Sequence, residues 1–202
     1  MVKYQAAPMI IMENGITDLM VGGMQTLIND GHSVQLNFPA SQSDEFIVLG
    51  DKSYHLVQFH FHSPSENMLH KESFPLEIHF VHQSDDGELA VIGVFVEDGQ
   101  AGPNPVLQEI VDHLPNDQGQ EHTIQGERIN PAHLLPTKRD YYSFNGSLTT
   151  PPCSQNVQWI VMAHPITASS AQIVRLRREM GGANARPVQP LNGRVISYSE
   201  MK

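Results

Sequence analysis

Two histidine-bearing segments most constrain how this chain can fold. In the first, Gln-Phe-His-Phe-His, His60 and His62 stand two positions apart. Side chains at positions i and i+2 of a β-strand point to the same face, so both imidazoles leave the sheet together. The second segment, Glu-Ile-His-Phe-Val, places His79 and Val81 on one face in the same way. The pattern therefore predicts two neighbouring strands that carry three histidines on a shared face.

Three histidines around one point, with a fourth position open, form the arrangement of a catalytic zinc site. Any single histidine among the eleven in this chain is more often structural or exposed than a ligand. The His-x-His pair on an aromatic strand, followed by a third histidine, is a much stronger signal. We therefore predict that His60, His62 and His79 bind a metal ion, namely Zn²⁺.

The residues around these histidines also suggest how the rings are held. A ligating imidazole usually donates its other N–H to a neighbouring acceptor. Gln58 precedes His60 by two positions, and Glu77 precedes His79 by two, so each shares a face with its histidine. A glutamate that points into a core is costly unless it is paired, which favours a ligand-holding role for Glu77.

These segments resemble the zinc core of the α-class carbonic anhydrases, in particular those of bacterial type. Gly-Ser-Leu-Thr-Thr-Pro-Pro-Cys at 146–153 is similar to the most characteristic loop of that family. Asn-Asp-Gly-His at 29–32 resembles the segment around its proton-shuttle histidine, and the stretch 184–194 resembles its C-terminal signature. The matching motifs occur in the family's order.

The resemblance implies a mostly β, α+β fold in which a large, mostly antiparallel central sheet carries a few peripheral helices. A length of 202 residues suits one domain, so we treat residues 1–202 as a single domain. Its residues 1–27 are atypical, because the further N-terminal residues that family members carry have no match here. Cap-forming residues predict one helix that begins after Asn104 and another after Ser169.

The resemblance also implies a function, which is the reversible hydration of carbon dioxide to bicarbonate and a proton. In that family a zinc-bound hydroxide attacks CO2, and a histidine then carries the released proton away. By resemblance, His32 is the proton shuttle and the backbone carbonyl of Asn184 holds His62. Thr149 would accept a hydrogen bond from the hydroxide and donate its own proton to Glu66.

The substrate and inhibitors follow from the same resemblance. Because CO2 is apolar, its pocket should be apolar too. Sulfonamides and small anions should inhibit by taking the open position on zinc. The residues that match the family's substrate pocket are Val81, Val91, Leu148, Thr150, Val157 and Trp159.

Composition limits the partners of the chain. A net charge of −10 argues against nucleic acid, whose binding depends on Lys and Arg at phosphates. No apolar run reaches the roughly 18 residues of a membrane-spanning helix, so we expect no membrane partner. A shortened N-terminal region could exchange elements with a second copy, which would give a homodimer. The resemblance favours a periplasmic or secreted location, whereas the lack of a recognisable signal peptide leaves the cytoplasm open.

Three alternatives compete with this interpretation. A family member that has lost its activity would serve as a binding module, and the atypical N-terminal region could impair an intact ligand set. The spacing of His60, His62 and Glu66 also fits part of a cupin metal site, although Tyr54 and Ser73 stand where that pattern expects glycine. A zinc protease is disfavoured because the chain has no His-Glu-x-x-His motif.

Overall fold

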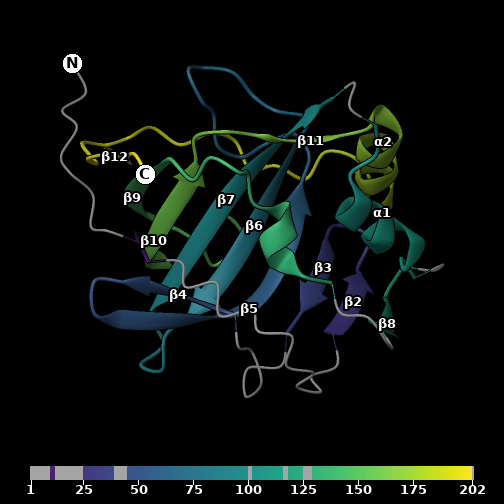
Figure 1. Cartoon of the computed structure of the whole chain (residues 1–202), viewed down its shortest axis with the longest axis horizontal. Coiled ribbons are helices and arrows are strands. Elements are labelled where there is room, and N and C mark those ends of the chain that lie inside the picture. Colours follow the sequence, from purple (N-terminus) through teal and green to yellow (C-terminus); the bar gives the residue numbers. More distant parts are fainter. Residues whose placement is uncertain are drawn as a thin grey trace.

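A computed structural model of the chain describes residues 10–11, 25–38, 45–99, 102–115, 118–124 and 129–201. Most of the region 1–27, expected to be atypical, lies outside these residues. The described part is built around one twelve-stranded sheet (Figure 1). Its strands are β1 (Ile10–Ile11), β2 (Gln25–Asn29), β3 (Val34–Asn37), β4 (Phe46–Leu49), β5 (Lys52–His62), β6 (Leu76–Gln83), β7 (Leu89–Asp98), β8 (Gln120–Ile124), β9 (Tyr141–Ser147), β10 (Gln155–Met162), β11 (Ile166–Ala168) and β12 (Ser197–Ser199).

The main path of the sheet runs in the order β12-β9-β10-β7-β6-β5-β3-β2-β8. β4 pairs with β5 and β1, and β11 pairs with β7. The pairings of β7 with β10 and with β11 are parallel, and the other strand pairings are antiparallel. The prediction of a large, mostly antiparallel sheet is therefore confirmed.

Two α-helices, α1 (Pro105–Asp112) and α2 (Ser170–Glu179), and a short 3-10 helix at Pro131–Leu134 complete the described part. The side chain of Asn104 accepts hydrogen bonds from the first-turn backbone of α1. Ser169 and Gln172 form a capping box at the start of α2. Both helix starts therefore lie where the sequence predicts them. Neither helix has the length and apolar character that crossing a membrane requires.

The alternation along β5 decides which side chains enter the core and which form the site. Phe59 and Phe61 are fully buried in the main hydrophobic core. His60 and His62 alternate with them and therefore point to the other face. β5 pairs with β6 so that His60 lies directly opposite His79, as the histidine pattern predicts.

Candidate metal centre and active site

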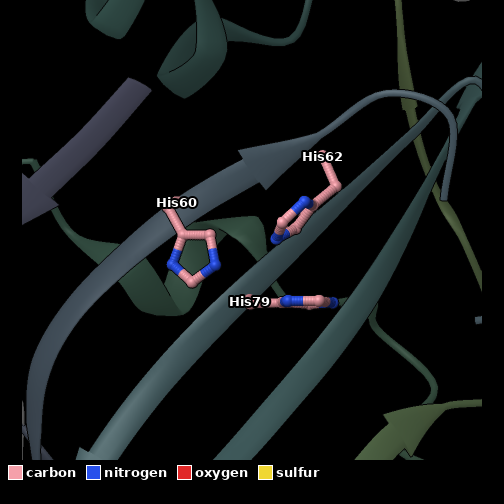
Figure 2. Close-up of side chains that lie close together, drawn as sticks. All are labelled: His60, His62 and His79. Atoms are coloured by element: carbon pink, nitrogen blue, oxygen red, sulfur yellow. The ribbon is translucent and has the colours of Figure 1, made fainter. Parts of the chain in front are cut away.

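The three histidines converge on one point (Figure 2). His60 and His62 come from β5 and His79 from the neighbouring β6, with their rings turned toward a shared space. Each ring offers one nitrogen, and these three nitrogen atoms lie within 4.8 Å of one another. His62 and His79 are buried, and His60 is partly buried. The structure thus brings together the three residues that the sequence singles out as metal ligands.

Burial keeps two of these imidazoles neutral. It lowers the pKa of His62 to about 2, and the nearby His79 lowers this pKa further. Burial likewise holds the pKa of His60 well below its usual range, with His79 and His62 adding to the effect. A neutral imidazole is the form that can donate a nitrogen lone pair to a metal.

Two of the predicted holding contacts are present. Nδ1 of His60 lies 2.8 Å from Oε1 of Gln58, so Nε2 remains free to face the centre. Nε2 of His79 lies 3.1 Å from Oε1 of Glu77, which leaves Nδ1 free in the same way. This second pair is close, but its geometry falls short of a hydrogen bond. In both contacts one ring nitrogen faces the neighbouring side chain, so the other ring nitrogen is left to bind a metal.

The third predicted contact, between His62 and Asn184, is only partly formed. The backbone of Asn184 raises the pKa of His62 slightly against the larger effect of burial. Neither ring nitrogen of His62 makes a hydrogen bond, however. The side chain of Asn184 instead accepts from the backbone N–H of Ser63 at 2.8 Å.

Glu77 is the most heavily bonded acidic group of the site. Its Oε2 accepts from the backbone N–H groups of Glu66 and Asn67, both at 2.8 Å. Its Oε1 accepts from the side-chain amide of Asn67 at 2.7 Å. Although burial acts to raise the pKa of Glu77, His79 and these hydrogen bonds lower it below its usual range. Glu77 therefore links the ring of His79 to the loop that carries Glu66.

Gly93 of β7 provides the space for this network, and sequence reasoning did not single it out. A Cβ at Gly93 would lie 2.8 Å from Oε1 of Glu77. Gly93 is paired with His79 across the strands, so it lies next to the site in the sheet. A glycine inside a long apolar strand is the signal that could have found it, since such glycines often mark a close approach.

Glu66 and Thr149 are not joined as expected. Oε1 of Glu66 accepts from the backbone N–H of Arg186 at 2.7 Å. Its Oε2 has no hydrogen bond and lies 3.4 Å from Nε2 of His62. The expected hydrogen bond from Thr149 to Glu66 is therefore absent. Both residues line a cavity of about 310 Å³, which Trp159 also borders but the three histidines do not.

The predicted apolar pocket residues gather in one cluster beside the histidines. Cross-strand pairing places Gln58, Val81, Val91 and Trp159 in a row across four strands. The ring centroid of Trp159 lies 4.8 Å from that of His79. Thr150, which was also predicted for the pocket, is exposed. The predicted members of the cluster are Val81, Val91, Leu148, Val157 and Trp159.

His32 lies in the turn between β2 and β3, and its side chain is exposed. Oδ1 of Asp30 accepts from the backbone N–H groups of His32 and Ser33, at 2.8 and 2.6 Å. The carboxylate of Asp30 is therefore engaged with the backbone of the turn. The turn leads into β3, which pairs with β5, the strand that carries His60 and His62.

Comparisons with known proteins agree with this geometry. The family model described as eukaryotic-type carbonic anhydrase matches residues 18–200. A carbonic anhydrase of Pectobacterium atrosepticum is 44% identical over 176 residues, which cover 87% of this chain and 70% of that sequence. The solved α-carbonic anhydrase of Photobacterium profundum is 42% identical with a TM-score of 0.83, covering 98% of this chain and 85% of that one.

A second solved structure adds a ligand to the comparison. The α-carbonic anhydrase of Thermovibrio ammonificans, in complex with the inhibitor sulfanilamide, has a TM-score of 0.83 and 38% identity. It covers 97% of this chain, and this chain covers 81% of it. The cupin and protease alternatives find no support in this fold. The matched family model, the identity to bacterial relatives and the shared fold together show that this chain is an enzyme of the α-carbonic anhydrase family.

Proposed function

We propose that this chain catalyses the reversible hydration of carbon dioxide to bicarbonate and a proton, with zinc held by His60, His62 and His79. The observation that carries the proposal is the convergence of these three imidazoles on one point. The low pKa of both His60 and His62 keeps those two ligands neutral at physiological pH. The membership of the chain in the carbonic anhydrase family gives the reaction class.

The donor set fits zinc rather than a hard cation. Three imidazole nitrogens without a carboxylate in the set match the catalytic zinc sites that keep one open position. Both ring nitrogens of buried His62 lack a hydrogen bond, and a buried polar atom normally has a partner. Zinc in such a site lowers the pKa of a water ligand to about 7, a value known for carbonic anhydrases themselves, and so supplies hydroxide at neutral pH.

The surrounding residues have separate tasks in this proposal. The apolar wall of Val81, Val91 and Trp159 accepts CO2 beside the histidines and keeps competing water away from it. Gln58 and Glu77 hold the rings of His60 and His79 in the orientation that faces the centre.

Thr149 and Glu66 orient the attacking hydroxyl group. The hydroxyl of Thr149 can accept from that group and donate to a carboxylate, and the free Oε2 of Glu66 is available for this bond. His32, exposed at the turn between β2 and β3, transfers the released proton to buffer.

Inhibition by sulfonamides is part of the same proposal. The solved relative from Thermovibrio ammonificans binds sulfanilamide. We expect sulfonamides and small anions to compete for the open position on zinc in this chain as well.

Stopped-flow CO2 hydration on metal-analysed protein tests the proposal. We expect fast hydration with one zinc per chain, blocked by a sulfonamide. His79→Ala should lose zinc, and normal zinc content in that variant would show that the ligand assignment is wrong. Full zinc without hydration in the unaltered chain would refute the catalytic proposal and favour a binding role. Slower turnover in His32→Ala, restored by imidazole, would identify the shuttle.

A further inference from the structure

We propose that the side chain of Asn184 is a positioning residue that fixes the turn carrying His32 against the end of the ligand strand β5. Through this contact, Asn184 sets the rate at which the released proton leaves the site. The inference rests on the proposed function, because only a working site has a proton to release.

The side-chain amide of Asn184 bonds both the turn and the strand. Its Nδ2 donates to the backbone carbonyl of His32 at 2.9 Å and to that of Phe61 at 3.1 Å. Its Oδ1 accepts from the backbone N–H of Ser63 at 2.8 Å. Phe61 and Ser63 flank the ligand His62 in the sequence. One amide thus ties the His32 turn to the backbone on both sides of a zinc ligand.

The residues at the end of helix α2 lie against the same turn. A Cβ built on Gly181 would lie 2.6 Å from the carbonyl oxygen of Gly31, so only glycine allows this approach. Gly181 also has a φ of 72°, which glycine adopts at little cost. Nδ2 of Asn29 donates to Oε2 of Glu179 at 3.3 Å. The end of α2 and the segment that follows it therefore contact the end of β2 and the turn, and Asn184 also reaches β5.

The turn also has internal hydrogen bonds of its own. Asp30 bonds the backbone N–H groups of His32 and Ser33. Oδ1 of Asn29 accepts from the backbone N–H of Gly31 at 3.0 Å. Loss of the Asn184 side chain would leave only these local bonds to hold the turn, so the turn would shift relative to β5 and its backbone N–H groups would open to solvent more often. A misplacement of about 1 Å between reacting groups can cost up to about 100-fold in rate.

Kinetics of Asn184→Ala test the inference. We expect turnover at saturating CO2 in weak buffer to fall about tenfold, within the range that small misplacements cause. We expect kcat/KM for hydration to fall much less than turnover does, because the backbone of residue 184 stays in place. Added imidazole should restore turnover. Amide hydrogen exchange of residues 31–33 should become faster, and this readout does not depend on activity.

Two companion variants sharpen the test. Asn184→Asp keeps the shape and the acceptor for Ser63 but loses the donors, so it should behave like the alanine variant. Asn104→Ala is the matched control, because it removes an asparagine that caps α1 and donates weakly to Thr167. That control should leave turnover and the exchange of the turn unchanged.

The outcomes separate the inference from the proposed function. In a His32→Ala background, Asn184→Ala should slow turnover no further. Parallel losses of kcat and kcat/KM, or loss of zinc, would show that Asn184 supports the ligands and would overturn the inference. If the unaltered chain does not hydrate CO2, the proposed function fails and the proton-transfer claim falls with it. If amide exchange at residues 31–33 is also no faster in Asn184→Ala than in the unaltered chain, the positioning claim is refuted as well.

Discussion

Replacing Glu77 by glutamine should weaken zinc binding while preserving the fold. Glu77 is fully buried, and its two oxygens accept three hydrogen bonds from Glu66 and Asn67. The backbone donors can keep one oxygen of the new amide as their acceptor. The amide nitrogen then replaces Oε1 and faces Nε2 of His79, so that two donors oppose each other. His79 can relieve this only by moving its hydrogen to Nδ1, the nitrogen that the metal needs.

The magnitude follows from the contacts that are lost. The side chain of Asn67 can rotate its amide and present its oxygen to the new N–H2 group, so that contact is repaired. The contact of His79 cannot be repaired without the wrong tautomer. The 3.1 Å contact with His79 falls short of a hydrogen bond, so it contributes at most the roughly 1.5–3 kcal/mol of a hydrogen bond to a charged group. We therefore expect zinc affinity to fall by about 10–100-fold, the usual effect of removing a residue that holds a ligand.

Competition with a chelator of known affinity measures this change in Kd. Glu88→Gln is the matched control, since Glu88 is an exposed glutamate that pairs with Lys52. That control should leave the zinc Kd unchanged. An unchanged Kd in Glu77→Gln, together with unaltered urea unfolding, would refute the tautomer argument.

Three further predictions concern other parts of the site and core. Gly93→Ala should destabilise the fold by roughly 1–3 kcal/mol and weaken zinc binding, because its Cβ would meet Glu77; urea unfolding and zinc titration check this. Burial lowers the pKa of His82 to about 4, below the roughly 6.5 of an unfolded chain, so stability should be lost as pH falls between these values. At pH 5 this loss is about 2 kcal/mol, and His82→Gln should flatten the pH dependence of the urea midpoint. Zinc at about 1,000 times its Kd should stabilise the metal-free protein by about 4 kcal/mol, whereas His79→Ala should gain nothing in the same titration.

The sequence predicted the end of β5 well because histidine and phenylalanine alternate there. His60 and His62 stand out between buried phenylalanines, so one register alone keeps the phenylalanines in the core. The helix starts at Asn104 and Ser169 were equally predictable, since their cap residues carry a local signal.

Other features depend on partners that the sequence does not reveal. β8 (Gln120–Ile124) lies in a polar stretch of the sequence and pairs with β2 at the edge of the sheet. Most of its side chains are exposed, so no apolar alternation marks it. The role of Gly93 becomes evident only from the pairing of β6 with β7, which places it opposite His79. The contact between Thr149 and Glu66 was expected from resemblance and is not formed, although Oε2 of Glu66 has no other hydrogen bond.

The buried acidic residues of the site also favour a divalent cation there. Glu66 and Glu77 are both buried, and neither forms a salt bridge with a lysine or arginine in the described part of the chain. A buried carboxylate is costly unless it is paired and hydrogen-bonded. The neutral imidazoles of His60 and His62 offer no positive charge. A divalent cation held by the three histidines would place two positive charges beside two acidic groups. The acidic residues therefore favour a metal of charge +2, as the nitrogen donors favour zinc.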